Sequence, residues 1–176
     1  MNRLTTLSLT TIALLAVAVA LPATNVVAQE KQRVSFKIPT ESTKYTQSVS
    51  LTVPDVPNHI LRAYDVHTTY ANNAPVINGV RLAESSVTGI GDRFDGSGDG
   101  RRYHVFGMEN GDKFFVRDSQ TVQNRSGKTN DTGSGLITSG TGKFAGMHGS
   151  VLQSGSFDIK SGLVETQYDI EYWIEK

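Results

Sequence analysis

The sequence predicts an all-β protein built as a single eight-stranded antiparallel (up-and-down) β-barrel. Beyond residue 29, apolar and polar residues alternate at a spacing of two, and no useful stretch repeats at the 3.6-residue spacing of a helix. Short clusters of Gly, Pro, Asn and Asp separate the alternating segments and favour tight antiparallel connections. Eight strands can close around an interior that holds side chains or one small ligand. A two-sheet sandwich is the alternative, because strand count alone does not separate the two folds.

Residues 1–28 have the three parts of a secretory signal peptide. Arg3 gives a basic start, residues 12–21 form an unbroken apolar run, and small residues end at Ala28. The apolar run is about half of the roughly 20 residues that span a bilayer, which favours a cleaved signal over a retained anchor. We expect a secreted or periplasmic protein that is cleaved after Ala28 and has no membrane span afterwards.

The remaining residues suit one domain with its own core. Residues 29–44 read as an N-terminal lead-in and residues 45–176 as the barrel domain. The chain has no cysteine, and residues 29–176 carry 16 basic and 17 acidic side chains with no basic stripe. This balance argues against nucleic acid as the main partner and against electrostatic binding to membranes.

The first strands follow from alternation and from the residues that interrupt it. Residues 33–38 form a short candidate strand within the lead-in. Residues 45–53 (YTQSVSLTV) alternate cleanly and end where Pro54 and Pro57 remove backbone donors. Two longer strands come next, joined by an Asn/Pro/Gly-containing stretch, and a very polar loop follows at residues 95–100. The two long strands span residues 59–70 and 80–94.

The second half begins with the clearest hairpin in the chain. Asn110 and Gly111 separate two alternating runs and predict a type I′ turn, in which both central residues take positive φ. A second loop is expected at residues 125–132. The four strands of this half span residues 101–109, 112–123, 133–138, 148–159, with a closing strand at 163–175.

The closing strand predicts which of its faces is buried. Tyr168, Ile170, Tyr172 and Ile174 share one face, while the other carries mostly charged residues. Because successive strand residues point to opposite sides of a sheet, the first set should face the core.

The sequence contains neither a complete metal-binding motif nor a recognisable catalytic nucleophile motif. Asp95, Ser97, Asp99 and Gly100 match the first positions of a calcium loop, but Phe106 stands where a bidentate carboxylate is needed. The histidines lack metal-site spacing, and no nucleophile elbow or cysteine occurs. We expect no cofactor and no metal.

The segment GTGKFAGMHGSVLQ, followed by the closing strand YDIEYWIE, resembles the signature of the allene oxide cyclase and dirigent-like β-barrel superfamily. The resemblance implies a calycin-like, allene-oxide-cyclase-like barrel in which glycines allow a tight backbone turn and a phenylalanine plugs one end. It describes a fold more than a chemistry. The residues that carry this structural motif are Gly140, Gly142, Phe144, Gly146 and Gly149.

A second resemblance lies in the run Tyr64-Asp65-Val66-His67, with Pro75 downstream. Allene oxide cyclases have a similar Tyr-Glu-Ile-Asn run, in which Glu stabilises developing positive charge while Asn and a proline carbonyl hold a water. By this resemblance Asp65 would be catalytic, and Tyr64, His67 and Pro75 would bind ligand. Here Asp replaces Glu and His replaces Asn.

Taken by themselves, these residues allow two interpretations. Asp65 and His67 share one strand face, and Tyr64 and Val66 share the other. If the first face lines the lumen, Asp65 is partly desolvated and its pKa is raised, which suits general acid–base catalysis. If the second face lines it, Asp65 and His67 are surface residues. Periodicity leaves both open.

The sequence therefore supports three hypotheses of function. The first is an exported, non-enzymatic barrel that binds a small apolar ligand in its lumen. The second is a cofactor-free isomerase or cyclase of allene-oxide-cyclase type, with Asp65 supplying charge. The third is a dirigent-like protein that orients a coupling reaction. Whether the protein is an enzyme, and whether it forms a homo-oligomer, stays open at this point.

Overall fold

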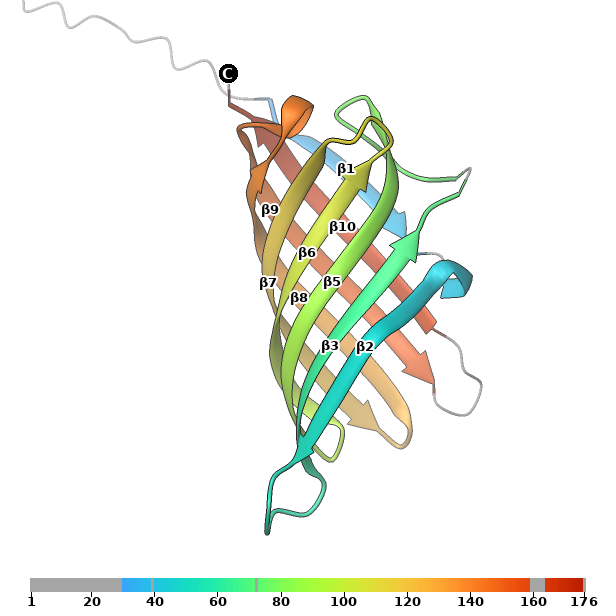
Figure 1. Cartoon of the computed structure of the whole chain (residues 1–176), viewed down its shortest axis with the longest axis vertical. Helices are drawn as coiled ribbons and strands as arrows, with labels where there is room; N and C mark the ends of the chain where they lie inside the picture. Colours follow the sequence, from blue (N-terminus) through green and yellow to red (C-terminus); the bar gives the residue numbers. More distant parts are fainter. Residues whose placement is uncertain (1–29, 39, 72, 159–163, 176) are drawn as a thin grey trace, which may run out of the picture.

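The computed structural model describes residues 30–175 except 39, 72 and 159–163, so the predicted signal peptide lies outside the described residues. The described chain contains ten strands and two short 3₁₀ helices (Figure 1). No helix of the described residues is long and apolar enough to cross a membrane. The strands are β1 (Gln32–Lys37), β2 (Thr43–Thr52), β3 (His59–Thr69), β4 (Val76–Ile77), β5 (Val80–Phe94), β6 (Ser97–Met108), β7 (Lys113–Arg125), β8 (Lys128–Gly140), β9 (Met147–Asp158) and β10 (Val164–Ile174), and the 3₁₀ helices are η1 (Thr40–Ser42) and η2 (Gly142–Phe144).

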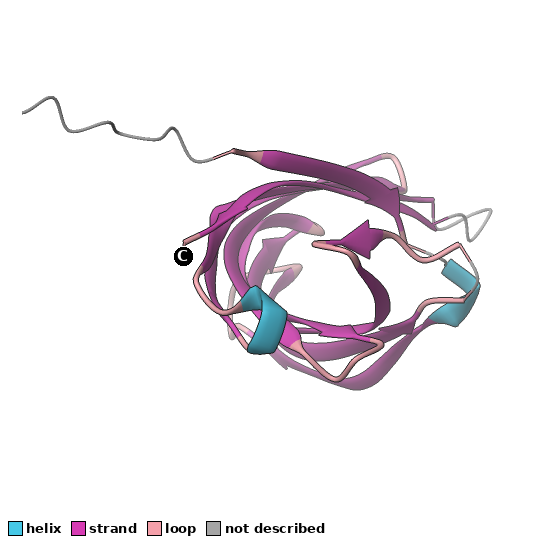
Figure 2. Ribbon diagram, turned by 90° about the horizontal axis from the view of Figure 1, so that it is seen from above, coloured by secondary structure: helices cyan, strands magenta, loops and turns pink. Residues whose placement is uncertain are grey.

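The strands form one antiparallel sheet in the order β1-β10-β9-β8-β7-β6-β5-β3-β2, and β4 pairs with β5. The sheet curls around a central space, so the barrel-like architecture is confirmed and the two-layer sandwich is not (Figure 2). The eight expected strands are present, and the lead-in adds β1, which pairs with β10. Strands β1 and β2 are the two edges, and no pairing between them occurs among the described residues.

The two expected polar loops are corrected to tight turns. Residues 95–96 and 126–127 take positive φ, with values of 49° and 76° in the first turn and 54° and 87° in the second, and strands run directly into both. These are the φ signs of type I′ hairpins. The polar segments 95–100 and 125–132 looked like loops because their strand positions are rich in Gly, Asp, Asn and other polar residues, with Thr129 and Thr132 the only β-branched ones.

The turn at Asn110 and Gly111 is also corrected. Gly111 takes a φ of 85°, whereas Asn110 does not take positive φ. The Gly111 amide donates to the Met108 carbonyl at 2.9 Å, and the Met108 amide donates to the Asp112 carbonyl at 2.9 Å. This is a three-residue hairpin loop with glycine in the left-handed position. The Asn110 side chain instead accepts a hydrogen bond from the Asp112 amide at 3.1 Å.

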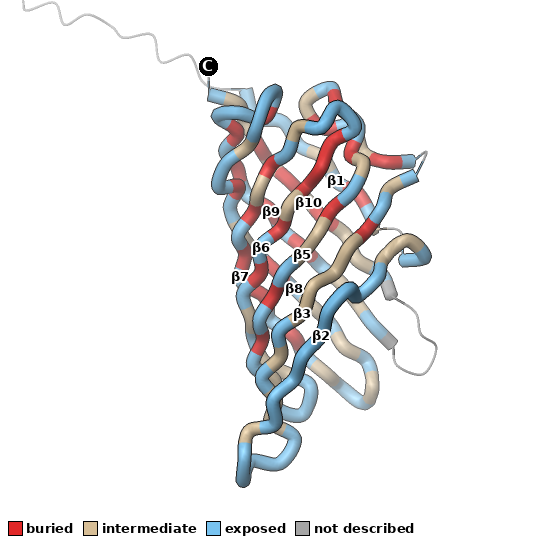
Figure 3. The backbone as a smooth tube through the Cα atoms, viewed as in Figure 1, coloured by how far each residue is buried: buried red, intermediate tan, exposed pale blue. Residues whose placement is uncertain are grey.

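Aromatic side chains fill the end of the barrel that carries η2, and buried residues gather toward this end in Figure 3. Phe106 stacks on Phe114 at a ring distance of 4.6 Å, and Phe114 stacks on Phe144 of η2 at 5.7 Å. All three are fully buried. The face predicted for the closing strand is confirmed. Its buried members are Tyr168, Ile170 and Tyr172, with Ile174 packed against them.

The glycines of the 140–149 segment let η2 lie flat over this end. A Cβ at Gly140 would overlap the backbone of Phe144, and one at Gly149 would overlap the backbone of Glu171. Gly142 and Gly146 take positive φ values of 52° and 72°. Side chains are thus excluded where backbone approaches backbone.

Truncating the plug should destabilise the fold. We expect Phe144→Ala to lower the free energy of unfolding by about 3–5 kcal/mol, because it leaves a cavity among rigid aromatic rings. Urea unfolding followed by circular dichroism measures it. The control Phe94→Ala removes a ring that is 53% exposed and should cost less than about 1 kcal/mol. Equal losses in the two variants would contradict this account of the core.

Candidate functional site

The other half of the barrel is hollow and contains a cavity of about 580 Å³. Small-molecule sites typically span about 300–1,000 Å³. The cavity extends from Tyr168, below the aromatic core, to the end that carries the turns at residues 95–96 and 126–127. Its walls are inward-facing residues of strands at opposite sides of the curled sheet.

Glycines at inward positions create part of this space. Gly91 of β5 pairs with Gly100 of β6, so two facing positions carry no side chain. The Tyr64 ring lies against Gly89, and the Arg93 guanidinium lies over Gly91. A Cβ at Gly89 would overlap the Tyr64 ring. The glycines therefore make room for the Tyr64 ring and the Arg93 guanidinium to lie close to the sheet at the wall of the cavity.

One part of the cavity wall is apolar. It is formed by side chains of the strands around the opening and by the segment that leads into η1. These apolar residues are Ile38, Ile60, Val66, Val87, Val122 and Phe157.

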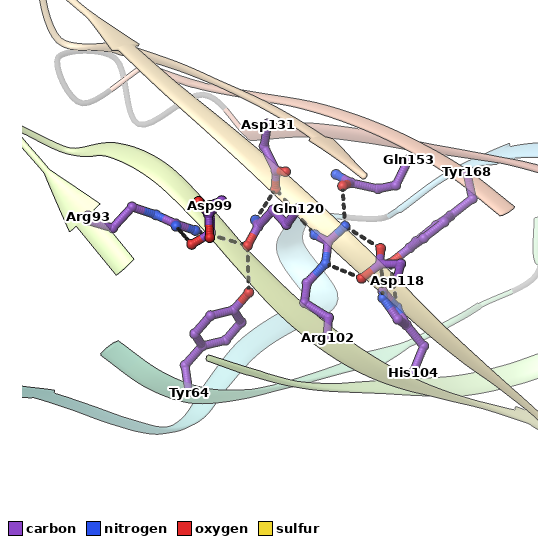
Figure 4. A network of polar contacts seen from close by, with 10 residues as sticks. All are labelled: Tyr64, Arg93, Asp99, Arg102, His104, Asp118, Gln120, Asp131, Gln153 and Tyr168. Carbon is purple, nitrogen blue, oxygen red and sulfur yellow. Dashed lines mark hydrogen bonds and ion pairs between the residues drawn. The ribbon is translucent and has the colours of Figure 1, made fainter. Parts of the chain in front are cut away.

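Another part of the cavity wall is built on a buried ion pair (Figure 4). Arg102 of β6 donates two hydrogen bonds to Asp118 of β7, from Nε to Oδ1 at 2.9 Å and from Nη2 to Oδ2 at 2.5 Å. Arg102 Nη2 also donates to Gln153 Oε1 at 2.8 Å. Arg102 and Asp118 are both about 4% exposed. These two parallel bonds fix the plane of the guanidinium. Its remaining amino group, Nη1, is directed along the cavity wall toward Asp131.

His104 and Tyr168 lie behind this pair. The His104 Nδ1 atom is 3.0 Å from Tyr168 Oη, and its Nε2 atom is 3.2 Å from Asp118 Oδ2 without an aligned hydrogen bond. Burial lowers the pKa of His104. Burial would by itself raise the pKa of Asp118, but its contacts with His104 and Arg102 outweigh burial and hold that pKa below its usual value.

Asp131 of β8 brings an incompletely paired carboxylate to the cavity surface. Its Oδ2 atom accepts a hydrogen bond from Gln120 Nε2 at 2.8 Å and lies 3.4 Å from Arg102 Nη1. Its Oδ1 atom is buried and has no hydrogen-bond partner among the described residues. Burial raises the pKa of Asp131 in spite of the nearby Arg102. Gln120 continues the network by accepting from Tyr64 Oη at 3.1 Å and from Arg93 Nη2 at 3.0 Å.

A stacked arginine completes the wall on the side of the edge strand β2. The Arg62 guanidinium lies 4.9 Å from the Tyr45 ring and 5.2 Å from the Tyr64 ring. Its Nε atom donates to Ser48 Oγ at 3.2 Å. The two rings pack edge to face at a centroid distance of 6.1 Å, and their contacts with the guanidinium restrict its orientation.

The structure decides which face of β3 is inside, and it is the face of Tyr64 and Val66. Asp65 lies outside and accepts hydrogen bonds from Thr46 at 2.6 Å and Thr88 at 2.7 Å. These bonds lower the pKa of Asp65, the reverse of the raised pKa that general acid catalysis in the lumen required. The lumen interpretation of Asp65 is therefore corrected.

Two other residues of the expected site also lie away from the cavity. His67 lies on the outer face, 3.2 Å from Glu84. The Pro75 carbonyl accepts the Leu82 amide at 2.9 Å, and neither Pro75 nor His67 lines the cavity. Tyr64 alone of the four ligand and catalytic candidates does so.

Sequence reasoning missed the ion pair and Asp131, although a signal for the pair exists. Asp118 shares its strand face with Val116 and Val122, and Arg102 shares its face with Phe106. A charged residue in phase with apolar ones is unusual, because burying a charge is costly unless it is paired.

No family model and no curated protein matches this sequence. Among solved structures, the chain is similar to the pterocarpan synthase dirigent protein GePTS1, with a TM-score of 0.50, 16% sequence identity, and coverage of 84% of this chain and 90% of that one. The fold is dirigent-like. This confirms the dirigent-like part of the sequence resemblance at the level of the fold, while the allene oxide cyclase part stays a prediction.

The buried histidine predicts a pH dependence of stability. As the pH falls through about 6.5, His104 gains a proton in the unfolded state but not in the folded state, so folding stability should fall by up to about 1.4 kcal/mol per pH unit. We expect His104→Gln to remove this slope between pH 7 and pH 5, measured by urea unfolding at each pH. His148→Gln, on the exposed outer face, should retain it. An unchanged slope in His104→Gln would refute the assignment.

Proposed function

We propose that the protein binds one small molecule with a largely apolar body inside the hollow half of the barrel. The observation that carries this proposal is a cavity of about 580 Å³ whose lining combines apolar side chains with charged ones, among them Arg93 and Asp131. A protein that needed only a stable barrel could fill these positions, as the aromatic end does.

The apolar and polar parts of the cavity surface favour different chemical groups on the ligand. The apolar residues favour a hydrophobic body, since each Å² of apolar surface removed from water contributes about 25 cal/mol. The Asp131 carboxylate, which lines the same cavity, favours a hydroxyl or amine donor on that body. A hydrogen bond to a charged group contributes about 1.5–3 kcal/mol, so a ligand donor that reaches this carboxylate gains affinity and orientation.

The proposed setting is outside the cytoplasm. The signal-like residues 1–28 support export, with cleavage after Ala28. An exported barrel with an open cavity can collect a ligand from the medium without a cofactor.

A neutral fluorescent probe tests the binding proposal. N-phenyl-1-naphthylamine has an apolar body and one N–H donor, and we expect it to bind with one-to-one stoichiometry and increased fluorescence. Val87→Trp fills the cavity and should weaken binding at least about tenfold. Ile90→Trp adds the same ring on the outer face of β5, where Ile90 is 60% exposed, and should bind like the wild type. No binding by the wild type, or equal loss in both variants, would rule out a ligand in the cavity.

A second candidate function follows from the structural neighbour, a dirigent protein. In this alternative the cavity orients reactive intermediates without carrying out the oxidation. An added one-electron oxidant removes an electron and a proton from each of two phenols, and the protein directs the face on which the two radicals form one carbon–carbon bond. The polar wall around Asp131 would hold the phenol oxygen.

Product chirality tests this alternative. We expect coupling of a para-substituted phenol, with the oxidant supplied, to give an excess of one enantiomer in the presence of the protein, measured by chiral chromatography. The excess should be lost in Val87→Trp and kept in Ile90→Trp. A racemic product with the wild type, at the same total yield, would reject a dirigent-like role and leave the binding proposal standing.

A further inference from the structure

Four charged side chains line the cavity, and three of them are arginines: Arg62, Arg93 and Arg102, together with Asp131. Arg102 is neutralised by its bidentate partner Asp118. The other two arginines therefore face one carboxylate, whose pKa is raised by burial. The cavity has an excess of at least one positive charge when Asp131 is ionised and of two when it is protonated.

Arg93 has only uncharged hydrogen-bond acceptors. It donates to the backbone carbonyls of Asp92 and Asp99 and, at 3.0 Å, to Gln120 Oε1. Burial lowers its pKa, and Arg62 is among the charges that lower it further, while Asp131 acts in the opposite direction. A half-buried guanidinium without a bonded carboxylate is incompletely compensated.

Arg62 is likewise held without a carboxylate partner. Among the described residues, its hydrogen bond goes to the Ser48 hydroxyl, and the guanidinium lies over the rings of Tyr45 and Tyr64, which pack edge to face against each other. Only its Nε donor is used in that hydrogen bond. A guanidinium fixed in this way is preorganised to bind a planar or tetrahedral anion through two parallel hydrogen bonds.

The two arginines are neighbours on the inner face of the sheet. In the pairing of β3 with β5, Arg62 lies opposite Gly91, and Arg93 lies two residues further along β5. Such diagonal neighbours are about 7–8 Å apart in an antiparallel pair, within reach of long side chains. Both line the same cavity, and Gly91 between them contributes no side chain.

We propose that the ligand is a monoanionic amphiphile, whose carboxylate or sulfonate-like group binds between Arg62 and Arg93 while its apolar body lies along the hydrophobic wall. This inference rests on the proposed ligand-binding function and names the ligand's charge class. The anion supplies the negative charge that neither guanidinium has as a hydrogen-bonded partner. Asp131, deeper in the network, repels a second anionic group and accepts a hydrogen bond from a donor on the ligand.

Two probes with one skeleton test the inference. 8-Anilinonaphthalene-1-sulfonate is N-phenyl-1-naphthylamine with an added sulfonate, so their affinities differ through the charged group. We expect the wild type to bind the sulfonate at least about tenfold more tightly than the neutral probe, as charge-assisted hydrogen bonds predict. Val87→Trp should weaken binding of both probes, which places both in the cavity.

Arginine variants locate the anion site. Arg62→Gln and Arg93→Gln should each weaken binding of the sulfonate by about tenfold and change that of the neutral probe by less than about threefold. The matched control is Arg101→Gln, which removes a guanidinium from the exposed outer face of β6 and should change neither. Circular dichroism confirms that each variant is folded, and the wild-type affinity ratio does not depend on any variant.

The outcomes separate the two proposals. If the neutral probe binds in the cavity and the sulfonate binds no more tightly, the anion inference is overturned and the binding function stands. If the sulfonate binds more tightly but is insensitive to Arg62 and Arg93, the anion lies elsewhere and the inference is also overturned. If neither probe binds, the proposed function itself fails.

Discussion

Every second residue of a strand faces the inside of the curled sheet, and the side chains at these positions determine where the barrel is filled and where it is hollow. At one end the inward positions hold rings such as Phe106, Phe114 and Phe144, which pack against one another. Toward the other end Gly91 and Gly100 occupy paired inward positions, and the volume is left open. Because the same strands pass through both halves, the aromatic end acts as a rigid base that holds the cavity walls in place.

The Arg102–Asp118 pair lies at the boundary between these halves. His104, which is hydrogen-bonded to Tyr168, contacts it from the side of the aromatic core, and Gln153 and Asp131 contact it from the side of the cavity. An ion pair excluded from water is strong only if its remaining donors and acceptors are also satisfied. Arg102 meets this condition by sharing its donors among three neighbours. The cavity's polar wall is therefore organised before any ligand arrives.

How far the sequence predicts this arrangement depends on how strongly the two faces of a strand differ in polarity. On the closing strand, Tyr168 and Ile170 alternate with charged residues, and the buried face follows directly. On β3, Arg62 and Tyr64 alternate with Ala63 and Asp65, so both faces mix polar and apolar groups. Alternation separates the two sets but does not say which is inside. That is decided by neighbouring strands, where Gly89 leaves room for the Tyr64 ring.

The polar site escaped sequence reasoning for a related reason, which is that its parts are distant along the chain. Tyr64, Arg102, Asp131 and Gln153 come from four strands, and only the register of the sheet brings them together. Polar or glycine-rich strand ends hid two hairpins as well, since the first four residues of β6, Ser97-Gly98-Asp99-Gly100, include none of the residues that favour strands. The 140–149 segment was informative because its glycines lie close together in one short stretch of sequence, in which Gly142 and Gly146 take positive φ.

The energetics of the interior point to a purpose for this polar wall beyond stability. Replacing a buried ion pair by apolar residues of similar volume is often neutral or stabilising, so selection for stability alone does not explain Arg102 and Asp118. The aromatic end shows that this chain can fill its interior with rings. Asp131 adds a further cost through an unpaired buried oxygen, and Arg93 adds a half-buried cation bonded only to neutral acceptors. We propose that a ligand offsets these costs when it binds in the cavity.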